Sequence, residues 1–296
     1  MDSLRIAILD LYEGETNEGM RCIKELVEQF STQSKFNVTY EVFDVRGALA
    51  VPGLEFDAYI SSGGPGSPIT SEGSEWERKY FKLMDAIQSH NKTSDEKKLV
   101  FLICHSFQIF CRHYELAKVS KRKSTSFGVM PVHKAKTGKH EPYFNLLEDP
   151  FWVIDSRDFQ ITQPNEWAIK KAGGNILCIE KERPLIPLER AVMAIRFNDE
   201  IIGTQFHPEA DYNSMFMYLV KSDKKELVIK KHGDKKYGEM LQRLNDPQKV
   251  KRTYNTIIPR FLREVERRKT IQRSAPLPPK GEPPAHRSES VPQFYL

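Results

Sequence analysis

Apolar residues in the first 110 positions follow two periods, one typical of buried strands and one typical of amphipathic helices. The pattern predicts strands at Arg5–Asp10, Asn37–Val45, Phe56–Ser61 and Lys98–Cys104, and helices at Glu18–Phe30 and Ser74–Asn91. Strands that alternate with helices form parallel sheets with right-handed crossovers. The chain therefore begins as an α/β fold with a mostly parallel sheet.

The middle of the chain is richer in strands, and the last part is helical. Strands are predicted at Thr125–Val132, Phe151–Val153, Gln160–Gln163, Ile176–Glu180, Ala191–Phe197 and Ile201–Phe206. Residues 212–269 show helical periodicity, and Pro259 is expected to kink the last helix. Residues 270–296 contain six prolines and little apolar periodicity, which predicts a disordered tail.

These shifts in pattern divide the chain into a domain at 1–215, a basic helical extension at 216–269 and a Pro-rich tail at 270–296. Residues 221–269 hold 16 Lys and Arg against 7 Asp and Glu, whereas residues 1–220 are mildly acidic. The basic segment either contacts nucleic acid or another anionic partner, or presents a solvated helical face docked on the acidic domain. The second interpretation is favoured because no nucleic-acid-binding motif accompanies the charge.

The composition also indicates in which cellular compartment the protein is expected. We find no apolar stretch of 18 residues for a membrane span, and a secretory leader is not expected, since a strand pattern begins at Arg5. Four cysteines in 296 residues, none spaced as CxxC, favour a reducing cytoplasm over a disulfide framework. The sequence predicts neither a metal site nor a cofactor.

Cys104 ends the apolar run that starts at Leu99, and a helical pattern follows directly. α/β enzymes present a nucleophile at such a sharp strand-to-helix turn, at the carboxyl edge of the sheet. The free N–H groups at the start of the following helix stabilise negative charge there. Cys104 is therefore the candidate nucleophile.

A cysteine nucleophile needs a base and a group that orients the base. His207 and Glu209 lie two residues apart at the end of a predicted strand, so their side chains point the same way. Pro208 between them favours an extended His207. Glu209 is thus expected to hold one imidazole nitrogen while the other faces Cys104.

A third segment, Ser61–Pro68, is a glycine-rich loop that follows a predicted strand. Glycines let backbone N–H groups approach a substrate, as an oxyanion hole for acyl transfer requires. Taken alone, the loop is also compatible with a tight turn or a phosphate-binding loop. It is not a Walker loop, because no Gly-Lys-Ser/Thr follows.

Together these segments resemble the class I (triad-type) glutamine amidotransferases, and most of all the glutaminase part of GMP synthase. The matching motifs are Ser62-Gly-Gly-Pro-Gly66, Ile103-Cys-His-Ser-Phe-Gln108 and Gly203-Thr-Gln-Phe-His-Pro-Glu209. The resemblance covers residues 4–215. It implies a three-layer, flavodoxin-like α/β fold and an enzyme that hydrolyses the side-chain amide of L-glutamine through a cysteine thioester.

The resemblance also implies a role for each matching residue. Cys104 would be the nucleophile, His207 the general base and acid, and Glu209 its orienting partner. The N–H groups of Gly64 and His105 would form the oxyanion hole. Gly63 and Gln108 would contact the substrate.

The chain departs from the family pattern at the sharp strand-to-helix turn that carries Cys104, which we call the elbow. There Leu102 and Ser106 replace two glycines and are expected to narrow or re-angle the site. Ser156, Arg157 and Asp158 occupy the segment in which many relatives carry a substrate contact. They either bind the amino-acid part of the substrate or are ordinary turn residues. His105 is the alternative base, as in the related intracellular peptidases, but the His-Pro-Glu segment favours His207.

No synthetase motif accompanies the amidotransferase-like part. The leading interpretation is a glutaminase that passes ammonia to a separate synthetase partner. The alternatives are a stand-alone hydrolase of γ-glutamyl peptides or amides, and a non-catalytic binding module with the same fold. An extension packed over the active-site edge would favour the stand-alone hydrolase, whereas a projecting one would suit a docking arm.

Overall fold

The computed structural model describes residues 3–15, 17–185, 187–220, 225–226, 228–230, 233–246 and 249–274. Its strands are β1 (Ser3–Asp10), β2 (Asn37–Asp44), β3 (Ala58–Ser61), β4 (Leu99–Ile103), β5 (Ala117–Lys134), β6 (Phe151–Pro164), β7 (Asn175–Glu180), β8 (Val192–Arg196) and β9 (Ile201–Thr204). Its helices are α1 (Glu18–Ser31), α2 (Glu75–Thr93), α3 (His105–His113), α4 (Glu166–Lys171), α5 (Tyr212–Val220), α7 (Asp234–Leu244), α8 (Val250–Tyr254) and α9 (Ile257–Ser274), with a 3₁₀ turn at Thr137–Lys139.

The strands form one sheet in the order β2-β1-β3-β4-β9-β8-β7-β5-β6. The five strands from β2 to β9 are parallel neighbours, as the alternating pattern predicts. The remaining pairings, from β9 through β8, β7 and β5 to β6, are antiparallel. Because β4 and β9 are adjacent and parallel, their carboxyl ends deliver Cys104 and the His207 segment to the same edge.

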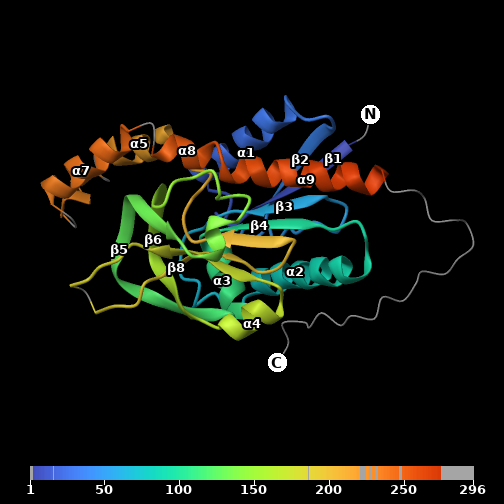
Figure 1. The fold of residues 1–296 in the computed structure, drawn as a ribbon, viewed down its shortest axis with the longest axis horizontal. Coiled ribbons are helices and arrows are strands. Elements are labelled where there is room, and N and C mark those ends of the chain that lie inside the picture. The colour runs from blue at the N-terminus through green and yellow to red at the C-terminus, as the bar shows by residue number, and fades with distance from the viewer. Residues whose placement is uncertain are drawn as a thin grey trace, which may run out of the picture.

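Helices cover both faces of the sheet, which gives the expected three layers (Figure 1). Successive residues of β4 alternate between the two cores: Phe101 and Ile103 pack with α1 and α9, whereas Val100 and Leu102 pack with α2 and α3. This period of two follows from the pleat of a strand that is buried on both faces.

The last helix of the extension is part of the main core. Ile257, Ile258, Phe261, Leu262 and Val265 of α9 are buried against the sheet and α1. Its charged side is docked on the acidic body as well. Arg268 lies 3.3 Å from Glu200, and Lys269 lies 2.5 Å from Asp57. These contacts agree with the interpretation of the basic segment as a docked helical face.

The first part of the extension lies at the other end of the molecule, over the β5–β6 ribbon (Figure 1). Met215 and Leu219 of α5, Val228, and Met240 and Leu244 of α7 form a third apolar cluster with that ribbon. Of the two placements weighed for the extension, this segment therefore adopts the packed one.

Three local expectations need correction. The separate strands predicted at Phe151–Val153 and Gln160–Gln163 are one continuous strand, β6, so Asp155–Phe159 is not a turn. The strand predicted at Thr125–Val132 extends over 18 residues as β5, because β6 pairs with it along most of its length. Pro259 does not kink a helix: it lies in the first turn of α9, where its missing N–H has no helical partner to lose.

Among the described helices, none combines the length and the apolar character that crossing a bilayer requires. The tail predicted to be disordered is described only as far as Ser274, as the end of α9, and positions 275–296 lie outside the described residues.

Candidate active site

Cys104 occupies a strained turn between β4 and α3. Its φ of 48° and ψ of −96° lie where a residue with a Cβ is rarely found. The backbone on both sides is fixed, since the Cys104 N–H donates to the Thr204 carbonyl at 2.8 Å and its carbonyl accepts from Gln108 N–H at 2.9 Å. Non-glycine residues in such conformations cost about 1–3 kcal/mol and cluster at functional sites. The elbow predicted from sequence is therefore present.

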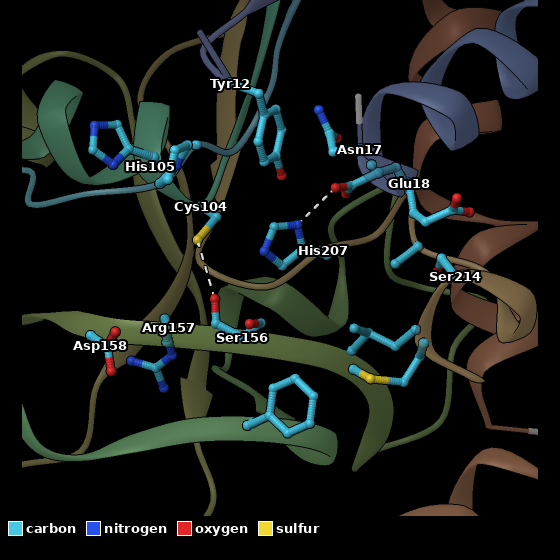
Figure 2. Close-up of a pocket in the computed structure, with 18 of the residues that line it drawn as sticks. Tyr12, Asn17, Glu18, Cys104, His105, Ser156, Arg157, Asp158, His207 and Ser214 are labelled. Atoms are coloured by element: carbon cyan, nitrogen blue, oxygen red, sulfur yellow. Dashed lines mark hydrogen bonds and ion pairs between the residues drawn. The ribbon is translucent and has the colours of Figure 1, made fainter. Parts of the chain in front are cut away.

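His207 lies beside this cysteine (Figure 2), and its ring is paired with the side chain of Glu209. The Nδ1 atom of His207 lies 2.7 Å from Oε1 of Glu209, and the carboxylate is buried. Burial disfavours the imidazolium, but the negative charges of Glu209 and Cys104 outweigh it and raise the pKa of His207 well above its usual value. The backbone N–H of His207 donates a hydrogen bond to the Ile154 carbonyl at 2.9 Å, which anchors the His207 segment to β6.

The glycine-rich loop fits closely around this pair. A Cβ at Gly63 would lie 2.9 Å from Cε1 of His207 and 3.6 Å from Cβ of Cys104. A Cβ at Gly64 would lie 2.5 Å from the Leu11 carbonyl oxygen. Both positions thus require glycine for close approach. Gly63 is buried beneath His207, and Gly64 borders the cavity above Cys104.

The side chain of His105 points away from Cys104 (Figure 2). It is 2% exposed, and its ring packs beside Trp76, with centroids 6.2 Å apart. Its Nε2 atom is buried without a hydrogen-bond partner. Burial, followed by the charges of Arg46 and Arg112, lowers the pKa of His105 to about 3. The neutral imidazole is therefore unsuited to accept the thiol proton, while the backbone N–H of His105 still begins α3.

This buried imidazole predicts a loss of stability in acid. The unfolded chain binds a proton at His105 near its ordinary pKa of 6.5, whereas the folded chain does not bind it until about pH 3. The contribution of the neutral His105 ring to the free energy of unfolding is fully present above pH 6.5, and it decreases as the pH falls from 6.5 toward 3. Between pH 7 and pH 5, we expect this group to lower the free energy of unfolding by about 2 kcal/mol.

Urea unfolding of the wild type and of His105→Asn at pH 7 and pH 5 measures that contribution. The wild type should lose about 2 kcal/mol more than the variant over this interval. An equal loss in both proteins would contradict the assignment of a neutral buried His105.

Ser156, Arg157 and Asp158 lie on β6 opposite the elbow, in the wall of the cavity. The Ser156 carbonyl oxygen lies 4.0 Å from Sγ of Cys104. The Arg157 guanidinium is 1% exposed and binds Asp155 at 2.9 Å and Glu180 at 3.3 Å. Arg157 is thus occupied by structural ion pairs, and Ser156 presents its backbone to the thiol.

Gln108 forms the floor of the site together with a residue that the sequence analysis did not single out. Its Nε2 donates to Oε1 of Gln205 at 3.2 Å, and Nε2 of Gln205 lies 3.9 Å from Sγ of Cys104. Gln205 precedes the His207 segment by two positions. The chain of amides therefore links the predicted substrate contact to the nucleophile.

Leu102 and Ser106, which replace the two glycines of the family pattern, each have a defined place in the structure. Leu102 is buried in the core between the sheet and helices α2 and α3, where its cross-strand partner Gly203 leaves room for it. The Ser106 hydroxyl accepts from the Ile103 N–H at 2.8 Å and lies 2.9 Å from the Ser61 carbonyl. Ser106 thus ties the elbow to β3.

Several cavity residues were missed by the sequence analysis. Tyr12 follows β1, and burial together with the charges of Glu209 and Cys104 raises the pKa of its phenol well above the usual value. Its position after a parallel strand was a usable signal. The others include the polar residues Asn17, Glu18, Thr125 and Ser214 and the apolar residues Phe127, Ile154, Ala210, Met215 and Val228. The sequence patterns around the apolar ones are those of ordinary core residues.

The sequence matches the family of class I glutamine amidotransferases over residues 21–223, and the chain belongs to this family. The family is one of enzymes that act on glutamine amides. A glutamine amidotransferase from Thermotoga maritima is similar in structure, with 16% identity, a TM-score of 0.62, and coverage of 89% of this chain and 98% of that one.

Two further solved structures are similar to this chain. A glutamine amidotransferase from Methylobacillus flagellatus has 13% identity, a TM-score of 0.57, and coverage of 92% and 95% of the two chains. A candidate GMP synthase subunit from Thermoplasma acidophilum has 20% identity, a TM-score of 0.47, and coverage of 72% and 90%. Comparison with curated protein sequences gives no significant match.

Within the described part of the chain, no three His, Cys, Asp or Glu side chains gather as metal ligands. The four cysteines are free and buried.

Proposed function

We propose that this chain hydrolyses a γ-glutamyl amide through a thioester on Cys104. The observation that carries the proposal is the strained elbow at Cys104 beside the buried His207–Glu209 pair, whose atoms lie 2.7 Å apart. A nucleophile next to a base that is itself held by a third group is the arrangement that acyl transfer requires.

In the first half of the reaction, His207 takes the thiol proton and Sγ attacks the γ-carbonyl carbon of the substrate. The carbonyl oxygen becomes an oxyanion, which receives hydrogen bonds from the N–H groups of Gly64 and His105. His207 then donates its proton to the departing nitrogen, so the C–N bond breaks and the acyl group remains on sulfur. Glu209 stabilises the imidazolium during this step.

In the second half, His207 takes a proton from water, and the resulting hydroxide equivalent attacks the thioester carbon. The C–S bond breaks, glutamate leaves, and the proton returns to Sγ. The polar wall next to Cys104, which includes Asp158 and the Ser156 carbonyl, holds the amino-acid part of the substrate. Arg157 positions this wall through its ion pairs with Asp155 and Glu180.

The placement of the extension favours a stand-alone hydrolase over a partner-fed glutaminase. Val228 of the extension lines the cavity that contains Cys104, together with Met215 at the end of the preceding domain. A synthetase partner that received ammonia would have to meet an edge already covered by the chain's own helices. The four free cysteines support a location in the reducing cytoplasm.

The test uses the purified full-length protein without any partner. We expect it to release glutamate from γ-glutamyl ethylamide and glutamine, and we expect a glutamine-analogue electrophile such as 6-diazo-5-oxonorleucine to label Cys104, as measured by peptide mass spectrometry. Labelling without turnover would instead indicate a glutaminase that depends on a synthetase. Neither labelling nor turnover would indicate a non-catalytic binding module and would overturn the proposal.

A further inference from the structure

The cavity above Cys104 is larger than a glutamine side chain requires. Its volume is about 580 Å³, within the roughly 300–1,000 Å³ typical of pockets for whole drug-sized ligands. Residues from β5, β6, the His207 segment and the extension contribute to its wall. The extra space therefore belongs to the site itself.

The two ends of this cavity differ in chemistry. Asp158 and Arg157 lie on one side of Cys104, whereas Ser214 lies on the opposite side, beyond His207 (Figure 2). The His207 side has a polar part, with Asn17, Glu18 and Ser214, and an apolar part. The apolar part is formed by Phe127, Ile154, Ala210, Met215 and Val228, which belong to one buried cluster.

The backbone fixes the apolar wall next to the imidazole. The Ile154 carbonyl accepts a hydrogen bond from the backbone N–H of His207 at 2.9 Å, and Ala210 directly follows Glu209. Phe127 pairs in register with Ser156, whose carbonyl faces Sγ of Cys104. The apolar surface is thus continuous with the atoms proposed to react.

The direction of proton transfer decides which part of the substrate meets this wall. His207 protonates the departing nitrogen, so that nitrogen and its substituent must lie on the His207 side of Cys104. In glutamine the nitrogen carries only hydrogen, which would leave the apolar wall in contact with water. A hydrocarbon substituent would cover it, and each buried methylene would raise kcat/KM roughly three- to fourfold.

Charge further restricts the substituent. Among the described residues that line the cavity, Arg157 is the only Lys or Arg, and it is held by Asp155 and Glu180. Glu18 also lies at the His207 end of the cavity. Glu18 is ion-paired with Arg21, which does not itself line the cavity. A carboxylate on the leaving group would therefore find no unpaired cation among the described lining residues.

We propose that the segment formed by Phe127, Ile154, Ala210, Met215 and Val228 is a leaving-group subsite for a bulky, uncharged, apolar amine. The preferred substrates would be γ-glutamyl amides of such amines rather than glutamine or γ-glutamyl dipeptides. This inference rests on the function proposed above and specifies its substrate class.

Three substrates test the subsite on the full-length protein. γ-Glutamyl ethylamide and γ-glutamyl 2-phenylethylamide have leaving amines of similar basicity and differ mainly in apolar size. γ-Glutamylphenylalanine adds only a carboxylate to the second. We expect kcat/KM for the phenylethylamide to be at least tenfold higher than kcat/KM for the ethylamide. It should exceed kcat/KM for the dipeptide by a similar factor.

Variants show whether the preference arises at this wall. Met215→Ser should lower the phenylethylamide-to-ethylamide ratio at least threefold, and Val228→Thr, which keeps the side-chain shape, should lower it in the same direction. Met217→Ser, on the same helix but at a position 51% exposed, is the matched control and should leave the ratio unchanged. Thermal unfolding of each variant shows whether the fold is retained.

The outcomes separate the two proposals. Hydrolysis of all three substrates at similar kcat/KM would overturn the subsite and leave the hydrolase proposal intact. A dipeptide preferred over the phenylethylamide would also overturn it, because the wall would then accept a carboxylate. Absence of turnover with every γ-glutamyl compound would overturn the proposed function itself.

Discussion

Replacing Cys104 with Ala is expected to lower kcat/KM for γ-glutamyl amides by roughly 10⁵-fold or more. In enzymes that act through a covalent nucleophile, removal of that group alone costs nearly as much as removal of the whole triad. In this chain no other thiol can substitute, because burial raises the pKa of Cys22, Cys111 and Cys178. Glutamate release under single-turnover and steady-state conditions measures the effect.

Cys111→Ala is the matched control for that variant. Cys111 is fully buried on α3, the same helix that begins after the elbow, and it does not line the cavity. Its loss removes a sulfur from the core and should leave kcat/KM within about threefold, since the reacting groups are unchanged. Comparable losses in the two variants would show that the effect of Cys104→Ala comes from disturbed packing of α3.

The parallel part of the sheet could be predicted because β1, β3, β4 and β9 are buried on both faces and read as apolar runs. The edge strand β2 is more exposed, but its apolar and polar residues alternate. The β5–β6 ribbon was harder to recognise. Residues 117–125 of β5 are largely accessible and rich in Lys and Arg, so they carry no apolar alternation. Pairing with β6, rather than burial, holds them in a strand, and pairing between remote segments leaves no local signal.

The meeting of Cys104 with the His207–Glu209 pair could be predicted because the sequence signals for it are local. A strand that ends at Cys104, and His207 and Glu209 two residues apart, need only the topology of a parallel sheet to come together. The apolar wall has no such signal. Val228 and Phe127 are about a hundred residues apart, and each is typical of ordinary core packing until the extension folds over β5.

Arg157 shows where a pattern of residue types is insufficient. A cation in the wall of an amino-acid site suggests a contact with a substrate carboxylate. The structure instead places two carboxylates, Asp155 and Glu180, within 3.3 Å of its guanidinium. A buried charge requires such partners, and they were not apparent from spacing because Glu180 comes from β7.

The second large effect is expected at His207. His207→Asn should lower kcat/KM by roughly 10⁵-fold, because the departing nitrogen then has no proton donor and the thiol no base. The change should reduce labelling of Cys104 by 6-diazo-5-oxonorleucine in parallel. Since Asn is smaller than His and Gly63 packs against the ring, the substitution introduces no steric clash.

His105→Asn separates this role from the alternative base next to the nucleophile. Its side chain is buried away from Sγ, and its pKa of about 3 leaves it unprotonated at neutral pH, so we expect a loss of no more than about tenfold. A larger loss for His105→Asn than for His207→Asn would overturn the assignment. The general base would then be the residue beside Cys104, and the His207–Glu209 pair would be a structural contact that holds β6 to β9.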